Sequence, residues 1–132
     1  MIGGPGTVVR DAHFPGRAPI TAYGDGGFRF AEMSHRGAIL CLPSGIHGWA
    51  AVARPADLDE AAFAQPKDEA AGIDLLLLGM GRDPLPLPEV LRLHLAAAGL
   101  RVEVMATGAA VRTYNVLLAE GRAVAAALLP VD

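Results

Sequence analysis

Residues 73–79 read IDLLLLG, a nearly continuous apolar run of the length of one strand. Such a run is typical of a strand that is buried on both faces of a sheet, because neither of its faces is polar. Two later segments also predict strands: LRVEVMA at 100–106 alternates in polarity, and RAVAAALLPV at 122–131 is again mostly apolar. The second half of the chain therefore predicts three strands with a helix between each pair.

The ends of those two helices are marked in the sequence. Pro88 suits the first position of a helix over 88–98, and Gly99 suits its left-handed cap. Thr107 is a good N-cap for a second helix, which is expected to run to about Glu120. Right-handed crossovers would then place the three strands in one sheet with helices covering its faces.

The first half of the chain predicts shorter elements. Residues 1–19 are rich in proline and glycine and predict an irregular arm. ITAY at 20–23 and FRFAEM at 28–33 predict a β-hairpin around a glycine-rich turn. AILCLP at 38–43 and WAAVA at 49–53 predict two further strands, which either extend the main sheet or pack across it.

A short helix is predicted between the two halves. Asp57 can cap LDEAAFA, with Glu60 completing a pair that resembles a capping box, and the helix should end before Pro66. The length of 132 residues fits one domain, and no internal repeat is visible. Residues 20–132 are therefore expected to form a single α/β domain.

Composition excludes several classes of function. Hydrophobic residues make up 52% of the chain and charged residues 19%, which predicts a packed core. The net charge is -3 and the basic residues are scattered singly, so no nucleic-acid partner is expected, because phosphates need a concentrated positive face. There is no signal-peptide pattern, and no apolar run approaches the roughly 20 residues that span a bilayer. A cytoplasmic protein without membrane insertion is expected.

Catalytic and metal-binding patterns are not found in the sequence. Ser44 lies in PSG, which lacks the glycines of a nucleophile elbow, and no histidine and acid can be assigned to it. Cys41, the only cysteine, lies in an apolar segment and is interpreted as a small core residue. No metal and no cofactor are expected, because the histidines lack metal-ligand spacing with one another or with Cys41. The histidines are His13, His35, His47 and His94.

The segment GAAVRTYNVLLAEGR, residues 108–122, stands out for its polar residues. On a helix, Tyr114 belongs to an apolar stripe that faces the core. Gly108, Arg112 and Asn115, at i, i+4 and i+7, share another line of the same helix. An arginine and an asparagine are thus presented together.

Two interpretations of that line are open. In the first, Arg112 and Asn115 form part of a ligand or partner site, because a guanidinium suits a carboxylate or phosphate and an amide both donates and accepts. In the second, the residues serve the fold: Arg112 pairs with Glu120 or Asp74, and Asn115 satisfies exposed backbone at a sheet edge.

A second candidate site lies where two predicted strands end. Gly79 and Gly81 follow one strand, and Thr107 follows the next. In open α/β sheets, ligands bind outside the carboxyl ends of the strands. Residues 79–82 and 107–112 could therefore form a crevice for an anionic small molecule, with Thr107, the helix amides and Arg112 as its contacts.

Four segments together resemble the Mth938-domain proteins: YGDGGFRF, GAILCLP, LLLLGMG and VEVMATGAAVRTYNVLLAEGRAVAAALLP. The resemblance runs from about Tyr23 to the C-terminus. It implies a three-layer α/β fold with a central mixed β-sheet, helices packed on that sheet and an N-terminal β-hairpin. It also implies that no enzymatic activity is established, and that a eukaryotic branch acts as an assembly factor for mitochondrial respiratory complex I.

The favoured hypothesis is accordingly a non-catalytic binding or assembly module. Its expected partner is a protein, with subunits of a respiratory complex as the first candidates, and it would reach the inner membrane only through that partner. The alternatives are the small-molecule site in the crevice, and a purely structural role in which Glu120 pairs with Arg112 or Arg122. The resemblance marks these candidate binding residues: Gly79, Gly81, Thr107, Arg112, Tyr114, Asn115, Glu120 and Arg122.

Overall fold

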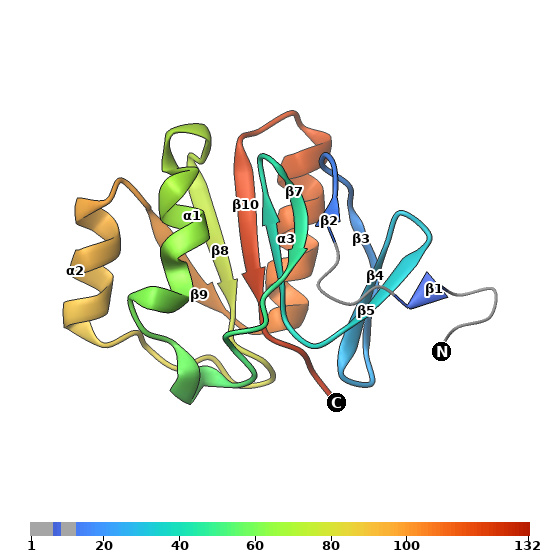
Figure 1. The fold of residues 1–132 in the computed structure, drawn as a ribbon, viewed down its shortest axis with the longest axis horizontal. Helices are drawn as coiled ribbons and strands as arrows, with labels where there is room; N and C mark the ends of the chain where they lie inside the picture. The colour runs from blue at the N-terminus through green and yellow to red at the C-terminus, as the bar shows by residue number, and fades with distance from the viewer. Residues whose placement is uncertain (1–6, 9–12) are drawn as a thin grey trace.

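The computed structural model of the chain describes residues 7–8 and 13–132, so part of the predicted arm, residues 1–6 and 9–12, lies outside the described residues. The described chain forms two β-sheets (Figure 1). The larger sheet has the order β2-β7-β6-β10-β8-β9, and the smaller one has the order β1-β5-β4-β3.

The centre of the larger sheet is formed by the three strands predicted in the second half of the chain. β10 (Val124–Leu128) pairs in parallel with β8 (Leu75–Gly79), which pairs in parallel with β9 (Val102–Met105). On its other side β10 pairs antiparallel with β6 (Ile39–Leu42), so the sheet is mixed, as expected. Two further antiparallel strands extend it: β7 (Gly45–Gly48) and β2 (His13–Phe14).

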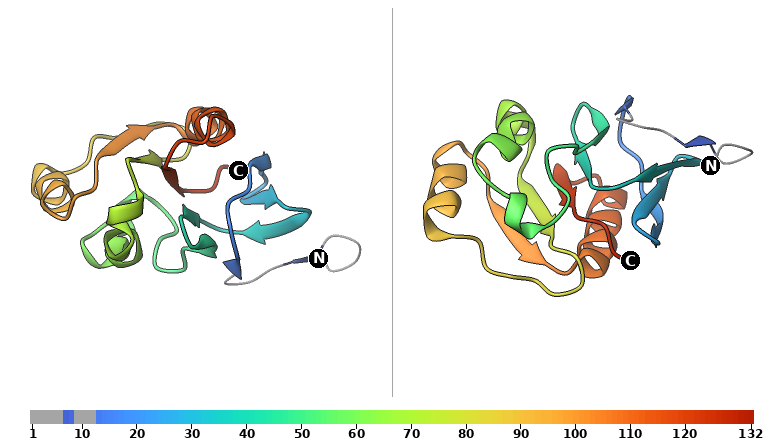
Figure 2. Two further views of the ribbon diagram at one scale, coloured as in Figure 1. Left: turned by 90° about the horizontal axis from the view of Figure 1, so that it is seen from above. Right: turned by 60° about the horizontal axis from the view of Figure 1, so that its bottom comes forward.

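Helices lie over both faces of this sheet (Figure 2). α3 (Thr107–Ala119) packs on one face, while α2 (Glu89–Ala97) contributes to the core on the other, where α1 (Ala64–Asp68) also lies (Figure 2). The alternation of the strands explains the two cores: Leu76 and Leu78 belong to one hydrophobic cluster and Leu77 to the other. The predicted three-layer α/β arrangement is confirmed.

The smaller sheet contains the predicted hairpin and two further strands. β3 (Ile20–Gly24) and β4 (Gly27–Phe30) pair antiparallel, as predicted. The prediction of one continuous strand over 28–33 is wrong, because Ala31 and Glu32 adopt φ of 48° and 61° and turn the chain into β5 (Met33–Arg36). β1 (Thr7–Val8) adds to β5 in parallel.

The predicted strand at 49–53 is also wrong. β7 ends at Gly48, and Val52 donates its backbone N–H to the carbonyl of Trp49 in a turn. The Trp49 side chain is buried, and its indole N–H donates to the carbonyl of Ala62 at 2.8 Å. Anchoring this ring in the core turns the chain away from the sheet.

The helix predicted after Asp57 differs as well. Short 3-10 turns occupy Pro55–Asp57, Ala61–Phe63 and Ala70–Gly72, and α1 continues through Pro66 instead of ending before it. Pro66 is tolerated because it lies in the first turn of α1, where no backbone N–H is needed. The Asp57 carboxylate accepts the N–H groups of Ala53 and Arg54, which lowers its pKa.

Candidate functional site

The polar line of α3 faces the edge of β3. The Asn115 Oδ1 atom accepts the backbone N–H of Ile20 at 2.9 Å, and its Nδ2 donates to the carbonyl of the same residue at 2.8 Å. β3 is the last of the described strands of the smaller sheet, so within residues 7–8 and 13–132 these two groups have no neighbouring strand to bind. The amide of Asn115 takes the place of that strand, as the structural interpretation of the line expected.

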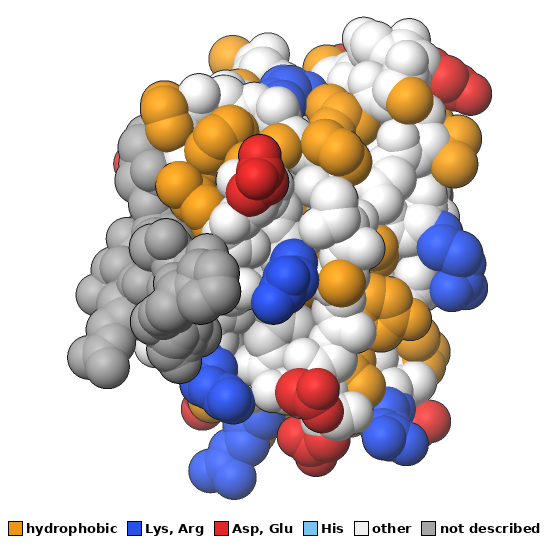
Figure 3. All heavy atoms as spheres, turned by 90° about the vertical axis from the view of Figure 1, so that its right-hand side faces the viewer, with side chains coloured by type: hydrophobic (Ala, Val, Ile, Leu, Met, Phe, Trp, Pro, Cys, Tyr) orange, Lys and Arg blue, Asp and Glu red, His pale blue; other side chains and the backbone are white. Residues whose placement is uncertain are grey.

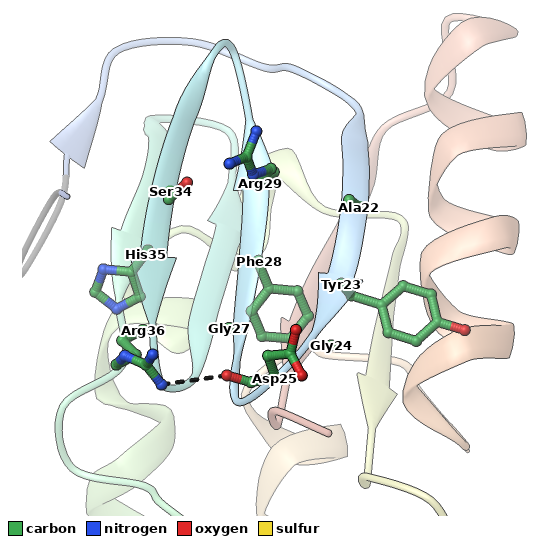
Figure 4. Close-up of a pocket in the computed structure, with 10 residues that line it drawn as sticks. All are labelled: Ala22, Tyr23, Gly24, Asp25, Gly27, Phe28, Arg29, Ser34, His35 and Arg36. Atoms are coloured by element: carbon green, nitrogen blue, oxygen red, sulfur yellow. Dashed lines mark hydrogen bonds between the residues drawn. The ribbon is translucent and has the colours of Figure 1, made fainter. Parts of the chain in front are cut away.

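Gly108, at the start of the same line, receives Tyr23. Figure 4 shows the Tyr23 ring pointing from β3 toward α3. A Cβ atom on Gly108 would overlap the Tyr23 hydroxyl and lie 3.2 Å from its Cζ atom. Only a glycine lets the ring approach the helix this closely. Tyr23 nevertheless keeps 42% of its surface exposed.

Arg112 lies between these two contacts and is exposed. Within residues 7–8 and 13–132, its guanidinium takes part in no ion pair, so the expected pairing with Glu120 or Asp74 is not formed. Its Nη1 atom lies 3.6 Å from the position that a Cβ on Gly108 would occupy, close to Tyr23. One turn further along, Val116 is 56% exposed. We call Tyr23, Arg112 and Val116 the α3 face.

Glu120 and Arg122 lie just beyond the helix and are both exposed. In the described part of the chain they form no ion pair with each other or with Arg112. The backbone carbonyl of Arg122 instead accepts a hydrogen bond from the Arg17 guanidinium at 3.4 Å. The pairs that the structural interpretation expected, Glu120 with Arg112 or Glu120 with Arg122, are therefore not formed.

Tyr114, on the apolar stripe, is buried as predicted. Its hydroxyl donates to the carbonyl of Ala18 at 3.3 Å and shares a hydrogen bond with the buried Cys41 thiol. Burial raises the pKa of Cys41 from 9.0 to about 12 and also raises the pKa of Tyr114. Cys41 is thus a neutral core residue, and it lacks the lowered pKa of a nucleophile.

Thr107 lies where β8, β9 and β10 end. The prediction that it caps α3 is wrong: Ala106 is the N-cap and Thr107 is the first helical residue. The buried Thr107 hydroxyl donates to the carbonyl of Leu129 at 2.7 Å and accepts the N–H of Gly81 at 2.9 Å. The backbone N–H of Thr107 donates to the carbonyl of Gly81 at 2.8 Å.

These bonds tie the 79–82 loop to the start of α3, where the second candidate site was expected. A Cβ on Gly79 would lie 3.0 Å from both the Cα and the Oγ1 atoms of Thr107. The glycine at position 79 therefore serves close packing of the chain. The hydroxyl that could have bound an anion is used by the protein itself.

A polar cluster that the sequence did not indicate lies between β7 and the end of α1. The Ser44 hydroxyl donates to Glu69 Oε2 at 2.6 Å and lies 2.8 Å from His47 Nε2, while Glu69 Oε1 accepts the Ser44 N–H at 2.8 Å. The statement that no histidine and acid can be assigned to Ser44 is therefore wrong. Glu69 is 25 residues away from Ser44, and no local pattern connects the two.

The geometry of this cluster differs from that of a catalytic triad. In a triad the serine hydroxyl donates to the histidine and the acid orients the other ring nitrogen. Here both oxygens of Glu69 bind Ser44 directly. The cluster links the turn before β7 to the end of α1. Among the described residues, this cluster included, no group of three His, Cys, Asp or Glu side chains is arranged to hold a metal ion.

A hollow of about 270 Å³ lies on the smaller sheet beside the α3 face (Figure 4). Tyr23, Gly24, Phe28 and Arg29 are among its lining residues, and Arg36 donates to the carbonyl of Asp25 at 3.2 Å within it. On the side of the molecule where this sheet lies, acidic and basic side chains stand interspersed, and neither sign forms a continuous patch (Figure 3). A field of one sign that would steer a highly charged partner is not visible on that side.

A family model described as "Protein of unknown function (DUF498/DUF598)" matches residues 20–129. NADH dehydrogenase (ubiquinone) 1 alpha subcomplex assembly factor 3 of Mus musculus is 31% identical over 120 residues, which make up 90% of this chain and 64% of the mouse protein. The chain thus matches less than two thirds of the mouse protein's length.

Two solved structures are closely similar in fold. The crystal structure described as an outer membrane protein from Bartonella henselae is 52% identical, with a TM-score of 0.82 over 91% of this chain and 100% of that chain. The solution structure of a Mth938-like domain from Bordetella pertussis is 34% identical, with a TM-score of 0.74 over 86% of this chain and 85% of that chain. The resemblance inferred from the sequence is confirmed. In the described ranges, no helix combines the length and apolarity required to cross a membrane.

Proposed function

The chain belongs to the DUF498/DUF598 family of proteins of unknown function, and we propose that it is a non-catalytic protein-binding module that aids assembly of a respiratory, complex I-like membrane complex. The mouse relative, by its name an assembly factor for NADH dehydrogenase, supports this proposal. Fold and relationship alone do not carry a function, so the proposal also needs a surface of this chain.

The single observation that carries the proposal is the state of Arg112. Its neighbours on the helical line, Gly108 and Asn115, are occupied by β3, whereas the Arg112 guanidinium forms no ion pair within the described residues. It stands between the rim of the Tyr23 ring and the exposed Val116 side chain. Arginine and tyrosine are two of the residue types that are enriched at protein-binding hot spots.

The chemistry of the α3 face defines the partner that would fit. The planar fork of Arg112 suits a carboxylate of a partner protein. Tyr23 and Val116 would bury apolar surface around that ion pair and keep water from it. We therefore expect a partner segment that combines an Asp or Glu with apolar residues.

The remaining candidate residues would act on this surface indirectly. Thr107 anchors the start of α3 to the sheet, and Tyr114 and Asn115 fix its side against the core and β3. Glu120 and Arg122 would lie at the rim of a bound partner. Gly79 and Gly81 would support the surface by allowing the 79–82 loop to pack closely against Thr107 at the start of α3.

The geometry favours a protein partner over a small anionic ligand. The junction between 79–82 and 107–112 is closed by hydrogen bonds that use the Thr107 hydroxyl. The α3 face is instead an open strip of a helix and a strand with exposed side chains, which suits another protein surface better than it encloses a ligand. We place the protein in the cytoplasm, at the inner membrane only through its partner.

The test is a quantitative affinity purification from native membranes and cytosol with three tagged full-length chains: wild type, Arg112→Glu and Arg82→Glu. Arg82 is also exposed and forms no ion pair within the described residues, so its charge reversal is a matched control. Subunits of a respiratory complex should be enriched by the wild type and the Arg82 variant and lost with the Arg112 variant.

Two results would contradict the proposal. The assembly role is wrong if no respiratory subunit is enriched by the wild-type chain. The assignment of the α3 face is wrong if the Arg112 and Arg82 variants capture the same subunits equally well. Circular dichroism of each variant, matching that of the wild type, ensures that lost binding does not reflect unfolding.

A further inference from the structure

The two sheets differ in how their free edges are covered. The edge of β3 is capped by the side chain of Asn115. β9, at the end of the larger sheet, pairs with β8 alone among the described strands. It lies beside α2 at the end of the molecule opposite to the smaller sheet (Figures 1 and 2). An uncovered strand edge presents backbone groups that can pair with another chain.

The backbone pattern identifies which groups β9 presents. The carbonyls of Met105 and of Arg101, the residue before β9, accept hydrogen bonds from Met80 and Leu76, so these two residues turn their backbone toward β8. Because successive residues of a strand face opposite sides, Val102 and Val104 turn their N–H and C=O groups toward the free edge. The edge therefore offers two donors and two acceptors at a spacing of two residues.

The side chains at this edge are self-complementary. Arg101 and Glu103 flank Val102, and both are exposed. Neither of them forms a side-chain hydrogen bond or an ion pair with any described residue. Val102 packs against the core cluster on the α2 side, so Arg101 and Glu103 project together from the other face of the sheet.

We propose that the edge of β9 binds a second copy of this chain, in an antiparallel pair centred on Val102 that continues the larger sheet across a two-fold axis. In this register the two Val102 residues face each other and exchange hydrogen bonds. Val104 lies opposite Leu100 of the second copy, whose own N–H already donates to the carbonyl of Leu95 at 2.9 Å. Arg101 lies directly opposite Glu103 of the second copy, and the two-fold axis repeats this contact. These are non-hydrogen-bonded positions, where side chains approach most closely.

The charge pattern selects this register over its neighbours. Centring the pair on Glu103 would bring the two Glu103 carboxylates together, and centring it on Arg101 would oppose the two guanidinium groups. Like charges directly opposite each other destabilise a strand pair. The arrangement centred on Val102 is the one in which each charge meets its opposite.

The α2 helix adds an apolar border to the same edge. Leu93, on the outer side of α2, is 54% exposed. A hollow of about 390 Å³ lies between Arg92 and Ala96 of α2 and residues 101–102 at the start of β9. A second copy related by the two-fold axis would bring its own α2 to this side of the sheet and cover the exposed leucines. The surface lies away from the α3 face, so the two contacts can form at once.

The test compares the full-length wild type with Arg101→Glu, Glu103→Arg, the double charge swap, and Arg82→Glu as control. Molar mass is measured by light scattering over a range of concentrations. The wild type should approach twice the 13.6 kDa mass of one chain as concentration rises. Each single reversal should weaken the dimer by about tenfold or more, because it places like charges opposite each other at two symmetric positions. The double swap should restore dimerisation, and the Arg82 variant should behave as the wild type.

Amide hydrogen exchange provides a second readout at residue level. The Val102 and Val104 N–H groups should exchange more slowly at high than at low concentration, whereas Glu103 should not change, because its N–H faces β8. The proposal is overturned if the wild type remains monomeric at every concentration. It is also overturned if a dimer forms that the single reversals leave intact or the double swap does not restore, since that dimer would use another surface.

Discussion

Asn115 binds both backbone hydrogen-bonding groups of Ile20, a residue 95 positions earlier in the chain. Through this contact the helix α3 closes the edge of the smaller sheet and joins the two sheets. The same contact fixes the side of α3 on which Arg112 stands. Asn115, which the sequence suggests for binding, thus has a structural role. Its contact with Ile20 leaves the neighbouring Arg112 side chain available to a partner.

The contact between Asn115 and Ile20 should contribute measurably to the free energy of unfolding. Asn115→Ala removes two hydrogen bonds and leaves the N–H and C=O of Ile20 without their partner, so the free energy of unfolding should fall by about 1–3 kcal/mol. Arg112→Ala should change it by no more than about 0.5 kcal/mol, because the side chain is exposed and unpaired within the described residues. Urea denaturation measures both values. Equal losses in the two variants would mean that Arg112 belongs to the structural contact.

Gly108 and Tyr23 should be energetically coupled. Alanine favours a helix over glycine by up to about 1 kcal/mol, but its Cβ would displace the Tyr23 ring. Gly108→Ala should therefore stabilise the Tyr23→Ala protein more than it stabilises the wild type, with a coupling of about 0.5–1 kcal/mol. A double-mutant cycle by urea denaturation measures this coupling. A coupling of zero would show that the ring does not rest on the helix in solution.

Thr107 should be intolerant of losing its hydroxyl. Thr107→Val keeps the shape but removes the hydroxyl partner of the Leu129 carbonyl and of the partly buried Gly81 N–H, which should cost about 2 kcal/mol. Thr107→Ser keeps both hydrogen bonds and should cost about 1 kcal/mol for the lost methyl group. Thermal and urea unfolding of the two variants measure these losses of stability. The junction would not depend on the hydroxyl if serine were the more damaging change.

The protein should lose stability at alkaline pH. The pKa of Cys41 is raised from 9.0 to about 12 in the folded chain, so above pH 9 the unfolded chain releases a proton that the folded chain retains. The free energy of unfolding should fall as pH rises from 9 toward 12, with a slope approaching about 1.4 kcal/mol per pH unit. The raised pKa of Tyr114 adds to the loss above pH 10.

Cys41→Ala is the matched variant for this measurement. It should be less stable at neutral pH, because it leaves space in the core, but its stability should decline less between pH 9 and 10. Urea denaturation at each pH gives both curves. Parallel curves for the two proteins over this interval would show that the Cys41 thiol ionises equally in the folded and unfolded states.

The architecture was largely predictable because it follows from residues that are close in sequence. The run IDLLLLG and the apolar segment near the C-terminus both became buried central strands, β8 and β10. Gly99 takes the left-handed conformation, with φ of 89°, that its place after a helix predicts. The prediction failed at Ala31 and Glu32, where non-glycine residues adopt a left-handed turn that no strong local pattern marks.

The candidate site was predictable only in part. Helical spacing correctly placed Gly108, Arg112 and Asn115 on one line, but it could not show that β3 lies against that line. Thr107 has the residue type of an N-cap, and the carbonyl of Leu129 and the N–H of Gly81 use its hydroxyl instead. The Ser44–Glu69 contact gave no signal, because its partners meet only when α1 packs on the sheet.

By itself, the sequence determined the buried strands and the helices of the second half of the chain, the first hairpin, and the family to which the chain belongs. These properties depend on periodicity and on the preferences of neighbouring residues. The tertiary structure alone decided which polar groups are satisfied within the protein and which remain for a partner. A hydrogen bond needs two groups within about 3 Å of each other, and only the packing of distant segments brings Asn115 to Ile20 and leaves Arg112 beside them exposed.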